Sequence, residues 1–131
     1  MPSFSINGAA RLATCHPDLI RLFQSVVADV DCSILVGHRG RVDQEKAFQE
    51  GHSRAHFGES LHNYLPALAV DVAPFPINWE NIQRFNDFAA FVLKRADELK
   101  IPVRWGGTFK GLADLDHFEL VGYVGTLPAG E

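Results

Sequence analysis

The sequence predicts an α+β domain built on a small, mainly antiparallel sheet flanked by helices. The strand candidates are short and few, and helices and strands do not alternate as the strand–helix–strand units that build a parallel sheet. With 131 residues, of which 47% are hydrophobic and 21% charged, the chain has enough apolar material for one core but not for a second domain. We therefore expect a single domain over residues 1–131.

The first predicted elements are a helix and a buried strand. From Pro17 onward apolar residues recur at helical spacing, and a proline suits the first turn of a helix, so we expect a helix near 17–29. Residues 33–36 form a short apolar run typical of a buried strand. The Gly-His-Arg-Gly sequence at 37–40 predicts a turn, which places Arg39 at the end of that strand.

A short helix and a loop are expected next. Residues 42–50 are compatible with a helix, and Gly51 is a residue type that commonly ends one. The following residues to Glu59 show no periodicity, so we expect a loop that leads directly into Ser60 and His62.

Alternation over residues 68–73 predicts a strand and the direction of its one charged side chain. Side chains of a strand point to opposite faces in turn, so Val70 and Val72 face one side and Asp71 the other. The neighbours of Asp71 on its own face are the alanines at positions 69 and 73. Because these side chains are small, we expect the Asp71 carboxylate to be accessible.

A long helix and two strands complete the predicted fold. Asn78 is suited to capping a helix that ends at Lys100. One apolar stripe runs along this helix: Ile82, Phe85, Phe88, Val92, Ala96 and Leu99. The remaining strand candidates are residues 103–105 and 117–121, and the loop between them opens with two glycines. In the last strand His117 and Glu119 share a face, while the apolar residues between and after them point to the core.

Charge and composition exclude several classes of partner and compartment. The net charge is −4 and the basic residues are scattered, whereas nucleic-acid binding requires clustered positive charge. The first seven residues lack the basic and apolar regions of a signal peptide, and no apolar run reaches the length of a membrane span. We therefore expect folding in a cytosol and no membrane insertion. Cys15 and Cys32 lack CxxC spacing and are expected to be reduced.

Two segments carry histidine together with aspartate. The first extends from Ser60 to Asp71 and includes His62, and the second begins at Asp114 and includes His117. Together they can supply three metal ligands and a general base. A hydrolytic zinc site needs three protein ligands, an open position for water and a carboxylate near that water, so these residues are about the smallest set that is sufficient.

These residues resemble the VanY-type zinc peptidases, which cleave D-alanyl or L-alanyl-D-glutamate bonds of bacterial cell walls. The similarity is closer to the small phage and prophage L-alanyl-D-glutamate endopeptidases. It rests on Ser-x-His-Asn, Ala-Val-Asp-Val, a Pro-Ile-x-Trp segment, Arg-Trp-Gly-Gly, a terminal His-Phe-Glu-Leu, and an upstream Gly-x-Arg with Gln44. Many relatives separate the histidine from the aspartate by six residues including a glycine, whereas eight residues lie between His62 and Asp71 here.

The resemblance implies that His62, Asp71 and His117 bind Zn²⁺. Imidazole nitrogen and carboxylate oxygen are suitable zinc donors. Asp114 matches the acidic residue three positions before the last ligand, and is the expected general base that takes a proton from water and delivers it to the leaving amine; the alternative is a turn aspartate. Glu119 is a competing base, although its place favours orienting a ligand. Asp116 would point to the opposite face if the last strand has already begun at that position.

Further site residues are expected from the same resemblance. Arg39 would stabilise the oxyanion or hold a substrate carboxylate, unless it only forms a surface salt bridge. Gln44 accompanies it as a substrate-binding or supporting residue. Ser60 would hydrogen-bond substrate or fix the turn, and Trp105 would line the cleft or pack in the core.

Other site classes receive less support from the sequence. His52 and His56 have the i, i+4 spacing of a zinc-binding helix, but Gly51 argues against a helix there, so we expect a polar loop on the substrate side. The chain has no Gly-x-Ser-x-Gly sequence, which argues against a serine hydrolase.

The sequence thus predicts a zinc endopeptidase that acts on peptidoglycan as a phage or prophage endolysin, without a wall-binding module. We expect a monomer that stays in the host cytoplasm until lysis and reaches the periplasm or wall through a separate holin. The alternatives are a D-alanyl-D-alanine carboxypeptidase and a non-catalytic zinc-binding module similar to that of hedgehog proteins. The presence of Asp114 and Arg39 favours an enzyme over such a module.

Overall fold

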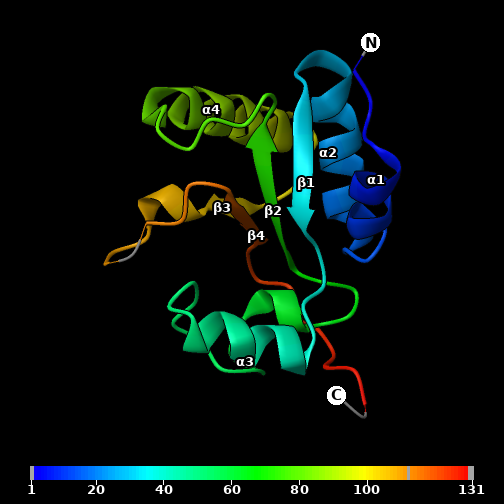
Figure 1. Cartoon of the computed structure of the whole chain (residues 1–131). Coiled ribbons are helices and arrows are strands. Elements are labelled where there is room, and N and C mark those ends of the chain that lie inside the picture. The colour runs from blue at the N-terminus through cyan, green and yellow to red at the C-terminus, as the bar shows by residue number, and fades with distance from the viewer. Residues whose placement is uncertain (1, 112, 130–131) are drawn as a thin grey trace.

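The computed structural model describes residues 2–111 and 113–129, and in this part of the chain helices surround one four-stranded sheet (Figure 1). The helices are α1 (Ile6–Leu12), α2 (Pro17–Asp29), α3 (Arg41–Gln49) and α4 (Ile82–Glu98). The strands are β1 (Cys32–Val36), β2 (Ala69–Pro74), β3 (Val103–Trp105) and β4 (His117–Leu120), and the short 3-10 turns are η1 (Leu61–Asn63) and η2 (Gly106–Thr108). The predicted α+β class is confirmed.

The sheet has the order β1-β2-β4-β3, and every neighbouring pair is antiparallel. This confirms the predicted antiparallel arrangement. In the pairing of the two central strands, Asp71 lies opposite His117. On the other side of β2, Asp71 pairs with Val36 across an irregularity in the register between Ile34 and Val36. The sheet therefore places two of the predicted ligands next to each other on adjacent strands.

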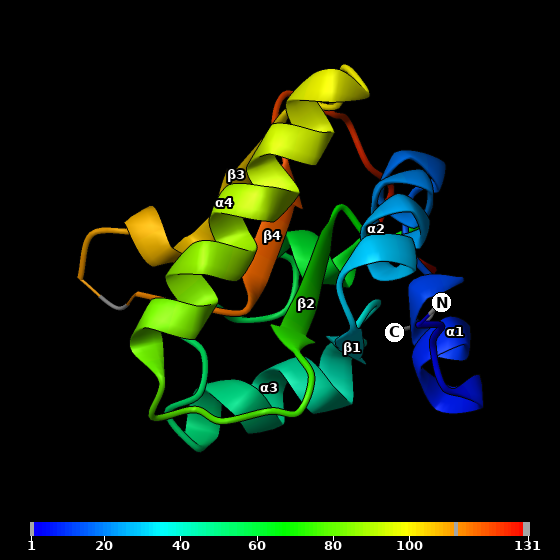
Figure 2. The ribbon, with the colours of Figure 1, turned by 90° about the horizontal axis from the view of Figure 1, so that it is seen from above.

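The core lies between the sheet and the helices α2 and α4. Phe118 of β4 is fully buried, and its ring contacts Phe23 of α2 and Phe88 of α4 edge-on. Figure 2 shows α4 beside β3 and β4, with α1 and α2 at the β1 end of the sheet. Since side chains alternate along a strand, the same strands turn Asp71 and His117 to the opposite face. One face of the sheet thus builds the core and the other is available for a site.

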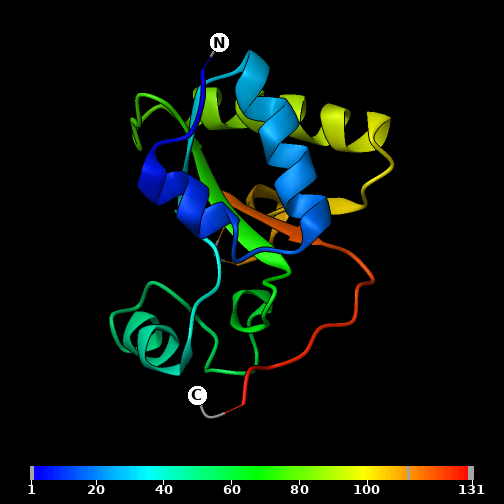
Figure 3. The same ribbon diagram turned by 90° about the vertical axis from the view of Figure 1, so that its right-hand side faces the viewer.

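The helix α3 stands apart from the other helices. In Figure 1 it lies below the sheet, and in Figure 3 the segment after β4 returns past α2 towards the same end of the molecule. Helix α3 ends where predicted, because Gly51 follows with a φ of 77°, a conformation that side chains other than glycine rarely adopt. This position lets α3 support the loops that carry the site.

Two features of the helices differ from the sequence prediction. Helix α1, which was not predicted, has only seven residues and is started by Ser5, whose Oγ accepts a hydrogen bond from the Gly8 amide at 3.0 Å. Helix α4 is capped by Asn81, so the predicted cap at Asn78 is wrong. Asn78 instead closes a turn by accepting from the Glu80 amide. Because the helix starts later, Ile82 lies in its exposed first turn and not in the apolar stripe.

The two cysteines are buried and free. Burial raises the pKa of both thiols to about 12, so neither has the thiolate character that a nucleophile needs. Among the described residues, the helices include none that is long and apolar enough to cross a membrane.

The packing of Phe118 predicts a large effect on stability. Replacing Phe118 with alanine is expected to lower the free energy of unfolding by about 3–5 kcal/mol, because it leaves a cavity between α2, α4 and the sheet. Urea denaturation followed by circular dichroism measures this change. Val124→Ala, at a side chain that is 97% exposed, should stay within about 0.5 kcal/mol of the wild type. Equal midpoints for the two variants would contradict this account of the core.

Candidate active site

An open cleft of about 1350 Å³ lies over the sheet face that carries Asp71 and His117. Its walls come from the loop after α3, from η1 and from the segment between β3 and β4. The lining residues are Arg39, His52, Ser53, Arg54, Ala55, Glu59, Ser60, Leu61, His62, Asp71, Trp79, Arg104, Thr108, Phe109, Lys110, Asp114, Asp116, His117 and Glu119. The cleft therefore brings together most of the site residues predicted from the sequence.

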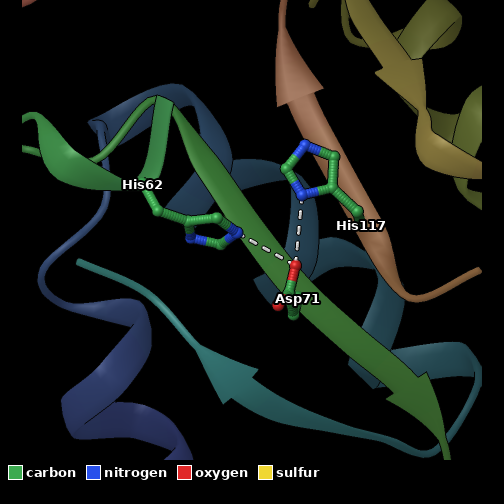
Figure 4. A group of neighbouring side chains, drawn as sticks. All are labelled: His62, Asp71 and His117. Carbon is green, nitrogen blue, oxygen red and sulfur yellow. Dashed lines mark hydrogen bonds and ion pairs between the residues drawn. The ribbon is translucent and has the colours of Figure 1, made fainter. Parts of the chain in front are cut away.

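The three predicted ligands meet at the floor of this cleft. Oδ1 of Asp71 lies 3.0 Å from Nε2 of His62 and 3.2 Å from Nδ1 of His117. Figure 4 shows both imidazole rings directed at Asp71, one from the turn before β2 and the other from β4. All three residues are buried. Asp71 is only 7% exposed, so the expectation of an accessible carboxylate is wrong, because the two imidazoles and Arg39 surround it.

Local structure holds His62 in place. Ser60 begins the turn η1, and its Oγ accepts from the His62 amide at 3.2 Å. The buried Asn63 side chain accepts from the amides of Gly58 and Ser60. The outer nitrogen of His62, Nδ1, lies 2.8 Å from the carbonyl oxygen of Gly37. A side chain at position 37 would collide with the backbone of α1, since an added Cβ would lie 2.2 Å from the Arg11 carbonyl. Glycine therefore lets this carbonyl approach the site.

The donor atoms fit a metal cation. Nδ1 of His62 faces a carbonyl oxygen and Nε2 of His117 lies 2.8 Å from Oε1 of Glu119, so each of these outer nitrogens must carry the hydrogen. In neutral imidazoles the inner nitrogens then direct lone pairs at the Asp71 carboxylate. The two imidazole nitrogens and the carboxylate oxygen all lie within 4.8 Å of one another. Because each presents a lone pair to the others, they repel one another unless a cation lies among them. This buried His-Asp-His group can bind a metal ion.

The ionisation of the group reflects the same contacts. Burial opposes the charge on Asp71, but the neighbouring His62 and His117 imidazoles outweigh it and hold the pKa of Asp71 below its usual range. Burial also opposes protonation of His117, yet the hydrogen bonds to Asp71 and Glu119 raise its pKa to about 9. Without a metal, a proton supplies the positive charge that the carboxylates require.

Arg39 is held beside the ligands by α3. Its Nη2 lies 3.7 Å from the second oxygen of Asp71, and its Nη1 donates to Oε1 of Gln44 at 3.3 Å. Gln44 is fully buried and donates in turn to Ser53 Oγ and to the Ala55 carbonyl. Gln44 does not line the cleft among the described residues, so its role is to orient Arg39 and the loop after α3.

Asp114 lies at the rim, on the loop that follows β3. Its Oδ2 is 3.9 Å from Nδ1 of His117, and its side chain is nearly half exposed. Its amide donates to the Gly106 carbonyl at 2.9 Å. The loop closes this tightly because residue 106 is glycine: an added Cβ would lie 2.3 Å from the Asp114 carbonyl oxygen. The carboxylate thus stands beside the ligands in contact with the cleft.

Asp116 also lines the cleft, which the sequence analysis did not anticipate. The condition under which Asp116 would point to the opposite face is not met, because β4 begins only at His117 and Asp116 still belongs to the preceding turn. Burial raises the pKa of Asp116 to about 8, and the charge of Asp71 and a hydrogen bond with Asp114 act in the same direction. Asp116 therefore adds a second carboxyl group to the cleft, hydrogen-bonded to that of Asp114.

The remaining predicted residues fall into different places. Ser60 and Glu119 both line the cleft. Glu119 accepts from His117 and pairs with Arg104 at 3.2 Å, so it orients a ligand. Trp105 is absent from the lining among the described residues; its indole N–H donates to the Leu115 carbonyl, which steadies the turn before β4.

The two loop histidines are separate from the metal-binding group. His52 lies at the cleft, 3.7 Å from a Glu50 oxygen. His56 stands outside it, bonded to Glu45 at 2.8 Å and in ring contact with Phe48. Their arrangement agrees with the predicted polar loop and not with a second zinc site in the described part of the chain.

The contact between His117 and Glu119 gives a prediction for metal affinity. Replacing Glu119 with glutamine is expected to weaken metal binding by about 10–100-fold, because an acceptor that orients the imidazole and increases its basicity loses its charge. Competition with a chromogenic chelator measures the dissociation constant. Glu98→Gln, on the exposed face of α4, serves as the control. An unchanged dissociation constant in Glu119→Gln would contradict this role.

Comparison with known proteins agrees with the site. The family model described as phage L-alanyl-D-glutamate peptidase matches residues 2–123. The fold is similar to the crystal structure of the L-Ala D-Glu endopeptidase ChiX of Serratia marcescens, with 30% sequence identity, a TM-score of 0.76, and coverage of 91% of this chain and 90% of that chain. No curated protein matches the sequence. The predictions of an enzyme and of its family are confirmed, and the chain belongs to the phage L-alanyl-D-glutamate peptidases.

Proposed function

We propose that this protein is a zinc endopeptidase that hydrolyses the L-alanyl-D-glutamate bond of peptidoglycan stem peptides, as a phage or prophage endolysin. The observation that carries the proposal is the buried His62, Asp71 and His117 group at the floor of an open cleft, with Asp114 and Arg39 beside it. The membership of this chain in the peptidase family supports the same reaction.

Zinc is the metal that this donor set suits best. Two imidazole nitrogens and one carboxylate oxygen form the three-ligand set of a catalytic zinc site, which keeps a further position open. Magnesium and calcium prefer sets made of oxygen ligands alone. When bound, zinc would supply a Lewis acid that polarises the scissile carbonyl and makes water more acidic.

The chain's own residues supply proton transfer. Asp114 reaches the cleft from the rim, and its carboxylate can take a proton from the water that attacks the L-alanyl carbonyl carbon. As the C–N bond breaks, the same carboxyl group returns the proton to the D-glutamate nitrogen, which leaves as an amine. Asp114 ends each cycle as it began, as a carboxylate.

Arg39 would stabilise the negative charge that develops on the scissile carbonyl oxygen. Its guanidinium is mostly buried beside Asp71 and is oriented by Gln44, so its position is preorganised before substrate binds. A fixed fork of donors stabilises an oxyanion more than a mobile surface cation does.

Digestion of purified peptidoglycan tests this function. The zinc-loaded protein, its chelated form and Asp114→Ala would be compared, and the soluble products identified by mass spectrometry. Peptides that begin with D-glutamate, with L-alanine left on the glycan, are expected from the zinc-loaded wild type alone. Release of free D-alanine would instead identify a D,D-carboxypeptidase, and no product would favour a binding role.

The proposal extends to how the enzyme reaches its substrate. We infer a monomer that accumulates in the host cytoplasm and reaches the periplasm or wall through a separate holin. Light scattering of the purified protein tests the monomer, and a mass of twice 14.5 kDa would contradict it. Expression in a bacterial host with and without a holin, followed by culture turbidity, tests the route to the wall, since lysis should require the holin.

A further inference from the structure

Three arginines line the cleft within the described residues, and they differ in whether another side chain already engages them. Arg39 is engaged by Gln44 and Asp71. Arg104 pairs with Glu119 and stacks on the Phe109 ring at 4.7 Å. Arg54 also lines the cleft, is exposed, and has no hydrogen-bond or ion-pair partner within residues 2–111 and 113–129. Its guanidinium donors therefore remain available to a ligand.

The Arg54 side chain extends towards the opposite wall of the cleft. It belongs to the loop after α3, yet its Nη1 would lie only 3.0 Å from a Cβ added at Gly111, on the opposite loop. Gly111 has a φ of 86° and stands three residues before Asp114. The guanidinium thus reaches the loop that carries the proposed general base. Lys110, which lines the cleft beside Gly111, adds a second positive charge there.

The chemistry of the substrate provides a matching anion, if the proposed function holds. In a stem peptide the D-glutamate is linked onward through its side-chain carboxyl, so its α-carboxylate is free. That carboxylate is attached to the carbon that bears the scissile nitrogen, two bonds from it. Because Asp114 must reach the same nitrogen to protonate it, a cation on the Asp114 loop's side of the cleft lies where the α-carboxylate arrives.

The geometry points to Arg54 as the residue that binds the free α-carboxylate of D-glutamate and so selects stems with an ionised group over stems with an amidated one. Arginine presents a planar pair of N–H donors that matches a carboxylate, whereas a neutral carboxamide offers a single acceptor and no charge. Arg54 is a substrate-binding residue in this account and takes no part in proton transfer.

A pair of synthetic substrates tests this assignment. One carries L-alanyl-γ-D-glutamyl-diaminopimelate, and the other has the D-glutamate α-carboxyl converted to the amide. With zinc-loaded wild-type protein we expect kcat/KM to be about tenfold higher for the free acid, the effect of one charge-assisted hydrogen-bonded contact. Arg54→Gln should lose about tenfold on the acid, little on the amide, and bring the ratio close to one. Arg54→Lys should keep part of the preference, since it retains the charge but not the fork.

Arg21→Gln is the matched control. It removes an equally charged side chain from α2, a helix that contributes no residue to the cleft lining within the described chain. Its acid-to-amide ratio should equal that of the wild type. An unchanged ratio in Arg54→Gln, with circular dichroism and zinc content intact, would overturn the assignment of Arg54 while leaving the proposed function standing. Failure of the wild type to cleave either substrate would instead overturn the proposed function.

Discussion

Replacing Asp114 with asparagine is expected to lower kcat for stem-peptide hydrolysis by about 10²–10⁴-fold, the usual contribution of a general acid–base group. Asparagine has nearly the same shape but accepts no proton at neutral pH. The hydrogen bond from the Asp114 backbone amide to the Gly106 carbonyl does not involve the side chain, so the loop should keep its position. Steady-state rates on a defined stem peptide measure the effect, and KM should change much less than kcat.

Two controls make the Asp114 result specific. Asp97→Asn, at an exposed position on α4, removes the same charge away from the cleft and should leave the rate unchanged. The zinc content of Asp114→Asn should equal that of the wild type, because Asp114 is not one of the three proposed ligands. Full activity in Asp114→Asn would rule it out as the base and direct attention to its neighbour Asp116.

Loss of the metal is expected to have the other large effect. Chelation of the wild type, or replacement of His62 with alanine, should lower hydrolysis by more than about 10²-fold, since loss of even an outer partner of a metal ligand costs 10–100-fold. Zinc content, measured by plasma mass spectrometry, should fall from one equivalent to a small fraction in both. Added zinc should restore the chelated wild type but not His62→Ala.

His52 offers a matched control for His62. It lies in the same cleft but outside the group of ligand atoms, so His52→Ala should retain one equivalent of zinc. His62 is buried, and its removal leaves the Gly37 carbonyl without its partner, which lowers the stability of the fold. Circular dichroism of His62→Ala therefore separates loss of metal from loss of fold. A folded His62→Ala protein that binds a full equivalent of zinc would contradict the ligand assignment.

Simple alternation in the sequence was enough to predict the sheet part of the site. The apolar residues of β2 and β4 have one face to bury, which forces Asp71 and His117 to the other face. The resemblance to the peptidase family then identified which of the polar residues belong together. The structure brings His62, Asp71 and His117 together, as these inferences predicted.

Other features depend on where an element begins, which sequence pattern determines less well. Asn78 and Asn81 are equally good caps as residue types, and the turn closed by Asn78 decides between them. The direction of Asp116 depends in the same way on where β4 begins: because the strand starts at His117, Asp116 lies in the preceding turn, where strand alternation does not set the direction of its side chain.

Several contacts between distant segments were not predicted from the sequence. The buried side chain of Gln44 holds Ser53 and Asn63 together with Arg39, and the Arg54 side chain extends to the neighbourhood of Gly111 on another loop. No periodicity records such contacts, since each depends on the complete packing of α3 and the loops around it.

The pairing of Asp71 with His117 also links folding to metal supply. These two residues are 46 positions apart in the chain and become neighbours only when β2 and β4 pair, so an unfolded chain holds no preformed ligand set. A cation that binds the native state alone therefore adds its binding free energy to stability, about 2.7 kcal/mol when its free concentration is 100 times the dissociation constant. The heat resistance of the protein should then follow the availability of free metal in the cell that makes it.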